Sequence, residues 1–188
     1  MDFDPLQAVH FHSRDPGVRW SKDSFVSLDL DRGLDRTKIL TPNVVRSDGG
    51  YRIYYTGLGP ERSGTNGYIL SAYSEDAVTW TKDAGIRVDV CPPFGSRRTL
   101  CPDVVPLADG GYRMYFEART ENRPTVILSA RSDDGLGWEV EPGLRFGDDQ
   151  WSYGTPRCIY TDQECACRLY FHRYTYPLRT GLDAGNVI

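Results

Sequence analysis

Two sets of similar segments recur along the chain with nearly the same spacing, and this internal repeat constrains the fold more than any other feature. Members of the first set end in tryptophan: ILSAYSEDAVTW at 69–80 and ILSARSDDGLGW at 127–138 match closely, and HFHSRDPGVRW at 10–20 is a weaker copy. Their closing tryptophans lie 60 and 58 residues apart. Repeats of this kind are units that bury their apolar residues against neighbouring copies.

The second set is out of step with the first and begins near a proline. It comprises TPNVVRSDGGYRIYYTG at 41–57, CPDVVPLADGGYRMYFEA at 101–118 and TPRCIYTDQECACRLYFHR at 155–173. The apolar Pro-x-Val-Val run of the first two copies predicts a buried strand. Followed by Asp-Gly-Gly and a tyrosine-rich run, it predicts two strands joined by a hairpin turn, because glycine adopts the positive φ of such turns. The first set then supplies a third strand, a turn and a fourth, tryptophan-bearing strand.

Repeated four-stranded antiparallel units predict an all-β fold, a β-propeller. Glycine and proline interrupt every window of helical length. We expect one partial propeller domain: 1–38 give the outer strands of a blade, 40–90 and 99–148 give complete blades, and 155–188 give inner strands.

These segments amount to about three blades, whereas propellers close with roughly four to eight. The pattern therefore favours a piece of a longer chain. Two alternatives remain: two copies close a ring by self-association through their open blade edges, or the N-terminal strands complete the C-terminal blade.

Composition and charge argue against several classes of protein. The net charge of −4 and pI near 5.4 disfavour binding to nucleic acid. No apolar run approaches the roughly 18 residues that span a membrane, and the acidic N-terminus lacks the features of a signal peptide, so we expect a cytoplasmic protein. An odd number of cysteines without metal-ligand spacing predicts neither a disulfide framework nor a metal site, and we expect no cofactor; they are Cys91, Cys101, Cys158, Cys165 and Cys167.

The motifs P-D-V-V, D-G-G-Y-R-M-Y-F and S-A-R-S-D-D-G-L-G-W, in that order, resemble the five-bladed propeller glycosidases. This superfamily includes arabinanases, levansucrases and invertases and is related to mannoside phosphorylases. The resemblance implies a site in the central funnel with three carboxylates: a base or nucleophile, a carboxylate that orients the substrate, and a glutamate as the general acid.

A second resemblance is to the Asp-box turns of sialidase-type propellers, which SRDPGVRW at 13–20 fits. Such boxes stabilise turns at the outer edge of a blade. We therefore expect structural roles for the aspartates of the three copies, Asp15, Asp76 and Asp134.

Residues that are identical in every copy, such as Arg52 and Arg113, are expected to serve the unit itself. Polar residues that differ between the repeats mark the candidate site. The residue after each proline is Asn43, Asp103 or Arg157, and the end of each second strand carries Thr56, Glu117 or His172. Because the two strands are antiparallel neighbours, both columns lie at the same end of the sheet.

We therefore predict that Asp103 and Glu117 present two catalytic carboxylates to one mouth, as glycoside hydrolysis requires. The resemblance supports Asp103 as a catalytic or substrate-orienting group at the start of an inner strand, and Glu117 is the candidate acid. Alternatively, Glu117 forms a salt bridge with Arg119 or Arg97.

Residues near the expected mouth are candidates for binding the ligand. They are Asn43, Arg98, Trp151, Tyr153, Arg157 and His172. Aromatic rings in the loops before the inner strands, which also contain Phe94 and Arg97, could stack on the C–H faces of a sugar. Alternatively, these loop residues serve only for packing.

The sequence thus predicts a glycoside hydrolase-like propeller acting on a carbohydrate. The alternatives are a non-catalytic propeller that binds glycans or proteins, and a sialidase-like protein. The sequence does not determine the sugar, the linkage or the stereochemistry.

Overall fold

The regular elements of the protein are strands. The structure, a computed structural model, describes residues 8–12, 19–31, 33–59, 66–161, 166–175 and 186–187. Every regular element in these ranges is a β-strand, which confirms the all-β prediction. Within them, no helix is long and apolar enough to cross a membrane.

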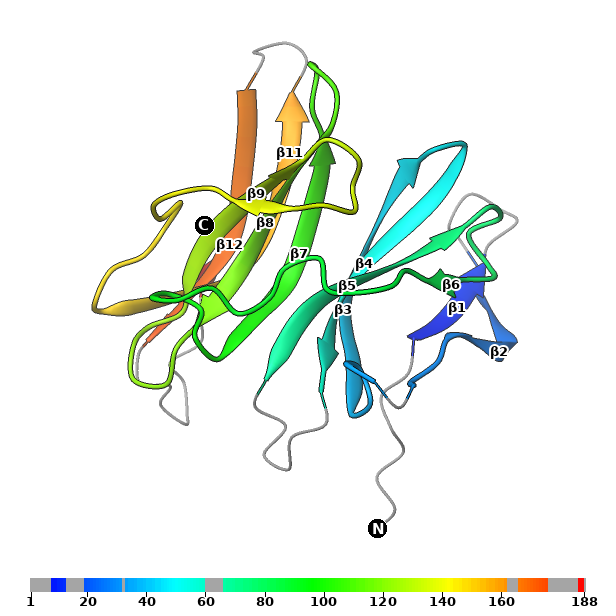
Figure 1. Cartoon of the computed structure of the whole chain (residues 1–188), viewed down its shortest axis with the longest axis horizontal. Coiled ribbons are helices and arrows are strands. Elements are labelled where there is room, and N and C mark those ends of the chain that lie inside the picture. The colour runs from blue at the N-terminus through cyan, green and yellow to red at the C-terminus, as the bar shows by residue number, and fades with distance from the viewer. Residues whose placement is uncertain are drawn as a thin grey trace.

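Two four-stranded antiparallel units form the centre of the molecule (Figure 1). The first unit contains β3 (Lys38–Ser47), β4 (Gly50–Leu58), β5 (Gly67–Ser74) and β6 (Thr81–Lys82). The second contains β7 (Arg98–Pro106), β8 (Tyr112–Arg119), β9 (Val126–Ser132) and β10 (Glu139–Val140). One parallel pairing, Gly67 with Arg98, links the third strand of the first unit to the inner strand of the second.

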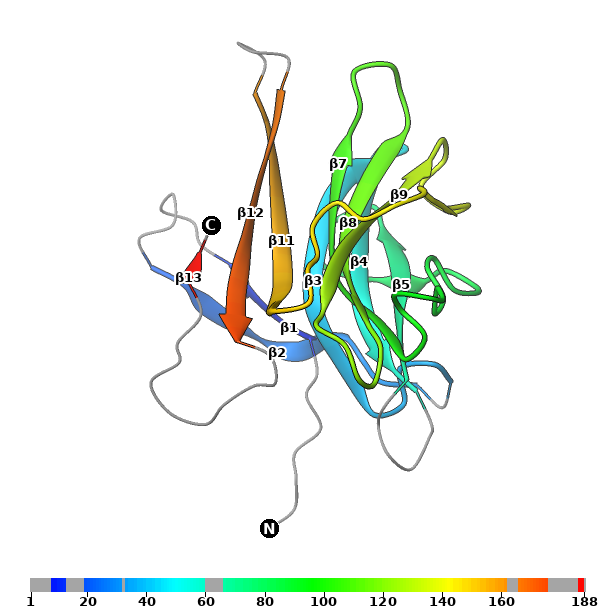
Figure 2. The same cartoon turned by 90° about the vertical axis from the view of Figure 1, so that its left-hand side faces the viewer.

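Shorter sheets flank these units. β1 (Ala8–His12) and β2 (Ser21–Leu28) form a two-stranded sheet, and the third unit contains β11 (Trp151–Thr161), β12 (Ala166–Thr175) and β13 (Asn186–Val187). Figure 2 shows the β11–β12 hairpin standing beside the sheet of the second unit. The described strands are stacked side by side as in part of a propeller, and they do not close a ring.

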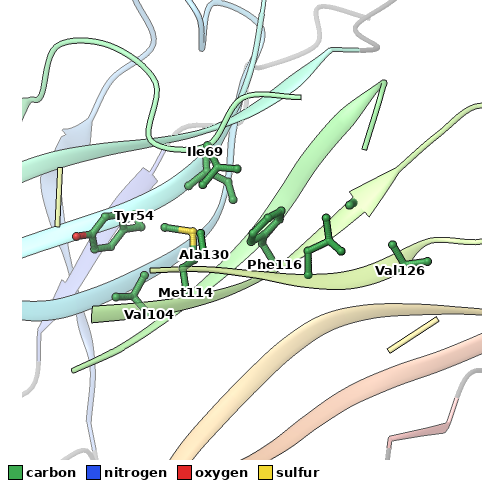
Figure 3. Packing of buried hydrophobic residues seen from close by; sticks show 10 residues of the cluster. Tyr54, Ile69, Val104, Met114, Phe116, Val126 and Ala130 are labelled. Carbon is green, nitrogen blue, oxygen red and sulfur yellow. The ribbon is translucent and has the colours of Figure 1, made fainter. Parts of the chain in front are cut away.

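The main apolar core lies between the first and second units (Figure 3). Tyr54 of β4 and Ile69 of β5 meet Val104 of β7 and Met114 and Phe116 of β8. The opposite face of the second unit packs on the third unit through another cluster. Because both faces of β7 and β8 are covered, large apolar residues occupy consecutive positions along them.

The first inner strand departs from the prediction that each Pro-x-Val-Val run is buried. Val104 is 4% exposed, whereas its equivalent Val44 is 48% exposed, and Pro42 is exposed as well. Val104 packs against the unit that precedes it. In the described residues only the two strands β1 and β2 precede β3, so that face of β3 has no inner strand to cover it.

Arginines that are identical in the repeat serve the units themselves, as expected. Arg52 Nε donates to Asp83 Oδ2 at 3.1 Å, and the same oxygen accepts from Ser71 Oγ at 2.6 Å. The second unit repeats this contact with Arg113, Ser129 and Glu141. The third strand and the segment after the tryptophan are thereby tied to the second strand of each unit.

The Asp-box aspartates stabilise turns, which confirms their predicted structural role where the structure describes them. Asp76 Oδ1 accepts the N–H groups of Thr79 and Val78 at 2.8 Å each, and these bonds lower the pKa of Asp76 to about 2. Asp134 makes the equivalent bonds in the second unit. Asp15 lies outside the described residues.

Candidate functional site

A β-bulge interrupts each inner strand at the residue before its proline. Regular pairing shifts between Leu40 and Asn43 in β3, between Leu100 and Asp103 in β7, and between Gly154 and Arg157 in β11. The bulged residues have φ values of 51°, 53° and 53°, in the left-handed region that residues other than glycine rarely adopt; they are Thr41, Cys101 and Thr155. Because a bulge disrupts the ladder, main-chain N–H groups there need partners from elsewhere.

The preceding unit supplies one such partner from the end of its second strand. In the first seam, between the first and second units, Thr56 Oγ1 accepts the N–H of Cys101 at 2.9 Å. In the second seam, between the second and third units, Glu117 Oε1 accepts the N–H of Thr155 at 2.6 Å. Thr56 and Glu117 therefore have the same structural role, because each accepts the N–H of the left-handed residue in the next unit.

The residue after the proline supplies a second partner. Asn43 Oδ1 accepts the N–H of Val104 at 3.0 Å, and Asp103 Oδ2 accepts the N–H of Cys158 at 2.5 Å. Asn43 Nδ2 also donates to Asp103 Oδ1 at 3.1 Å. The side chains of Asn43 and Asp103 and the main chain of β11 are thus joined by hydrogen bonds across both seams.

The Asp103 carboxyl is 5% exposed and is held mainly by this network. Burial raises its pKa, against the opposing effects of the Cys158 N–H and of Arg157, whose Nη1 lies 3.8 Å from Asp103 Oδ1. The structure therefore brings together three of the predicted site residues, Asn43, Asp103 and Arg157, one from each of the three inner strands.

Glu117 is 2% exposed and is fixed by donors on both oxygens. Besides Thr155, Arg119 donates to Glu117 Oε2 from Nε at 3.2 Å and from Nη2 at 2.9 Å. The salt bridge to Arg119 that the sequence offered as an alternative is therefore present. Burial, followed by the charge of Glu117 and a hydrogen bond to it, raises the pKa of the Cys101 thiol to about 12.

A pocket of about 440 Å³ opens beside Glu117 at the second seam. Its walls come from the start of β7, the end of β8, the start of β11 and the end of β12, which all lie at the same end of the sheets. The lining residues are Arg97, Arg98, Glu117, Arg119, Thr120, Arg123, Thr125, Ser152, Thr155 and Tyr174. Each lining residue has a polar side chain, and the guanidinium and hydroxyl groups supply hydrogen-bond donors for a polar ligand.

Gly154 makes room for the Glu117 carboxylate. Gly154 occupies the position of Leu100, because each directly precedes a bulged residue. A Cβ on Gly154 would lie 2.6 Å from Glu117 Oε1 and 3.1 Å from its Cδ. A longer acidic side chain on β8 is therefore matched by the loss of a side chain on β11.

The other predicted site residues lie elsewhere. The Tyr153 hydroxyl donates to Asp148 Oδ2, and its ring packs edge-on against Phe171 with centroids 5.5 Å apart. The ring of Trp151 carries the Arg173 guanidinium at 4.5 Å from its centroid. Neither ring lines the pocket at the second seam.

Arg157 and His172 occupy the positions in the third unit that correspond to Asp103 and Glu117. Arg157 Nη1 donates to the carbonyl of its own neighbour Pro156 at 2.7 Å. His172 pairs in register with Gly154 and is exposed. In the part of the chain that the structure describes, no inner strand follows the third unit. The main-chain N–H groups that Asp103 and Glu117 bind on the next inner strand therefore have no counterpart here.

Sequence reasoning identified Arg98 and Glu117 as site residues but missed most of the pocket wall. The missed residues are Arg119, Thr120, Arg123, Thr125, Ser152, Thr155 and Tyr174. A signal was available in the repeat: the position two residues after Thr56 is Leu58, and the position two residues after Glu117 is Arg119. Among the described residues no cluster of His, Cys, Asp and Glu could hold a metal ion.

Comparison with known proteins identifies the architecture. No protein-family model and no curated protein matches the chain. Among solved structures, sucrose-6-phosphate hydrolase from Lactobacillus gasseri is similar, with a TM-score of 0.69 and 21% identity over 91% of this chain and 34% of the other. Zg3597, a family 117 glycoside hydrolase from the marine bacterium Zobellia galactanivorans, has a TM-score of 0.64 and 19% identity over 90% and 57%.

An α-L-arabinofuranosidase from Lactobacillus brevis is similar too, with a TM-score of 0.66 and 13% identity over 89% of this chain and 55% of the other. These matches confirm the resemblance to the propeller glycoside hydrolases at the level of the fold. The chain spans between 34% and 57% of the length of these three proteins.

Proposed function

We propose that this chain is part of a carbohydrate-active propeller in which the pocket at the second seam holds the sugar and Glu117 acts on it. The observation that carries the proposal is a buried, firmly held carboxylate in the wall of a polar pocket. The fold comparisons support the reaction class, since the similar structures named above are glycosidases.

Cleavage of a glycosidic bond requires two carboxyl groups, one to protonate the leaving oxygen and one to activate water or attack the sugar. Glu117 lines the pocket and is assigned direct contact with the sugar, as the candidate acid. Asp103 lies on the neighbouring strand, and its raised pKa suits a carboxyl group that keeps its proton at higher pH. We assign Asp103 a positioning role, because it acts through the Cys158 N–H and the bulge of β11. The carboxyl group that activates water or attacks the sugar would then come from a residue outside the pocket lining described above.

A specific observation favours a second function, glycan binding without cleavage. Both oxygens of Glu117 and both oxygens of Asp103 accept hydrogen bonds from the protein. Carboxylates that are engaged in this way can orient hydroxyl groups of a ligand while contributing nothing to proton transfer.

Isosteric variants distinguish the two functions. Glu117→Gln keeps an oxygen for the Thr155 N–H and removes the acid. If the chain cleaves glycosides, Glu117→Gln should bind saccharides but release product at least about 100-fold more slowly, the usual contribution of acid–base catalysis. Binding and product release are followed by NMR over a panel of oligosaccharides, with Glu139→Gln on the exposed strand β10 as the matched control.

The outcomes separate cleanly. Binding without release by the unmodified chain supports the second function. Equal cleavage by Glu117→Gln removes Glu117 from the chemistry, and failure of the chain to bind any saccharide contradicts both functions. Asp103→Asn should alter the pH dependence of cleavage; an unchanged pH profile would show that Asp103 has no part in it.

A further inference from the structure

The pocket at the second seam is strongly basic on an acidic protein. Arg97 and Arg98 reach it from the start of β7, Arg119 from the end of β8 and Arg123 from the segment that leads to β9. Glu117 is the acidic residue in the lining, so the lining carries a formal charge of +3. The chain as a whole carries −4.

Acidic neighbours neutralise these arginines only in part. The Glu117 carboxylate engages two of the five N–H donors of Arg119, through one oxygen. Arg97 Nη1 lies 4.0 Å from Glu121 Oε1, and the Glu121 side chain is largely exposed, so this pair contributes little. The Arg119 and Arg97 guanidinium groups are therefore only partly neutralised by these carboxylates.

The arginines also crowd one another. Burial lowers the pKa of Arg98, and the charges of Arg97 and Arg119 lower it further. Like charges held together at a partly buried site are unfavourable for the empty protein, and such arrangements are concentrated at functional sites. A bound anion would relieve the repulsion.

The rest of the lining suits a polyol. Hydroxyl groups come from Thr120, Thr125, Ser152, Thr155 and Tyr174. Ser152 Oγ and Thr125 Oγ1 already order the wall, since Ser152 accepts the N–H of Thr125 at 3.0 Å and Tyr174 donates to Thr125 at 3.3 Å. A rigid row of hydroxyl groups next to guanidinium groups can bind sugar hydroxyls and an anionic substituent in the same ligand.

We propose that the ligand of this pocket is an anionic sugar, one that bears a carboxylate or a phosphate group. The guanidinium groups of Arg98 and Arg123 would bind the anion, and the hydroxyl groups and Glu117 would bind the sugar ring. This inference rests on the proposed carbohydrate function and narrows its substrate class from sugars in general to acidic ones.

Calorimetric titration of the full chain with matched ligands tests the inference. The probes are methyl glycosides of glucose and galactose, the corresponding uronates, the corresponding 6-phosphates, and inorganic phosphate. We expect one anionic series to bind at least about tenfold more tightly than the neutral series, with an affinity that falls as salt is raised. The uronate and phosphate arms show which anion is preferred.

Arginine variants locate the binding. Arg98→Gln and Arg123→Gln should each weaken the preferred anionic sugar about tenfold and leave the neutral glycosides unaffected. Arg46→Gln is the matched control, because Arg46 lies on β3 over the Tyr51 ring and is exposed. The melting temperature of each variant checks that it is folded.

Failure of this inference and failure of the proposed function give different results. Equal binding of neutral and anionic glycosides would overturn the inference and leave the carbohydrate function standing. If inorganic phosphate binds as tightly as the sugar phosphates, the pocket recognises only the anion. Both the carbohydrate function and the sugar part of this inference are then overturned.

Discussion

The two seams of this protein have the same backbone arrangement but differ in their side chains at the end of the sheets where the pocket lies. In the first seam, Leu58 of β4 meets Leu100 and Cys101 of β7 in a small apolar cluster. In the second seam, the corresponding positions hold Arg119 of β8 and Gly154 and Thr155 of β11, and a pocket opens there. A few side chains on a repeated backbone therefore decide whether a seam is closed or available to a ligand.

The shared part of the two seams explains why the difference is tolerated. In both, a side chain at the end of the second strand accepts the N–H of the left-handed bulge residue. Threonine does this in the first seam and glutamate in the second. Because the bulge is satisfied either way, the charge of Glu117 is added without losing the contact that holds the units together.

Removing the apolar closure of the first seam should have the largest effect on stability. Leu100→Ala deletes a buried side chain from the cluster with Leu58, and we expect a loss of about 2–4 kcal/mol in the free energy of unfolding. Urea denaturation measures it. The matched control is Leu144→Ala, at a side chain that is 38% exposed, which should change stability by about 0.5 kcal/mol or less. A similar small change for Leu100→Ala would mean that the first seam is not closed by packing.

Filling the space beside Glu117 should have the next largest effect. In Gly154→Ala the new methyl group would lie 2.6 Å from Glu117 Oε1, so the carboxylate must leave the Thr155 N–H. We expect about 1–3 kcal/mol of destabilisation and loss of ligand binding. Gly137→Ala is the control, because the atom nearest to its added Cβ is 3.8 Å away.

A double variant sharpens that comparison. Gly154→Ala combined with Glu117→Thr makes the second seam resemble the first, and the smaller threonine removes the clash. Stability should recover relative to Gly154→Ala alone, giving a coupling of about 1 kcal/mol between the two positions. Strictly additive effects would show that Gly154 is not there to accommodate Glu117.

The smallest effect is a change in the pH dependence of stability at Asp103. Burial raises the pKa of this carboxyl above the value of 3.8 of an exposed aspartate. The folded protein therefore binds the proton more tightly than the unfolded chain does, and ionisation removes stability as the pH rises from below 3.8 through the raised pKa.

Asp103→Asn cannot ionise, and its side-chain oxygen can accept the Cys158 N–H as Asn43 accepts that of Val104. Relative to the unmodified chain, the free energy of unfolding of Asp103→Asn should therefore increase from acidic to neutral pH. Urea denaturation at a series of pH values measures this difference. Asp109→Asn, in an exposed turn, is the control. A shift in favour of the unmodified chain would contradict the account of Asp103.

The sequence predicted those features that each repeat carries within itself. Arg52 and Arg113 bind acidic partners of their own unit, and Asp76 and Asp134 close turns within a few residues. The placement of Asp103 and Glu117 on neighbouring antiparallel strands also followed from the repeat. Local and periodic contacts of this kind can be read from one chain because both partners belong to the same repeat.

Contacts that depend on the neighbouring unit could not be read in the same way. Val44 is exposed because, among the described residues, no inner strand of a preceding unit covers its face of β3. The sequence of the Pro-x-Val-Val run does not reveal this. The roles of Asp103 and Glu117 as acceptors depend on left-handed bulges at Cys101 and Thr155, neither of which is a glycine. Trp151 was expected at the mouth, yet its ring is covered by Arg173.

A crystal structure of the chain soaked with the tightest-binding saccharide tests the central claim most directly. We predict that the sugar lies in the second seam, with Glu117 and Tyr174 in contact with its ring and hydroxyl groups. A sugar bound instead along Asn43 and Asp103, or at the outer hollow beside Trp138, would contradict the claim that the second seam has been opened for a carbohydrate.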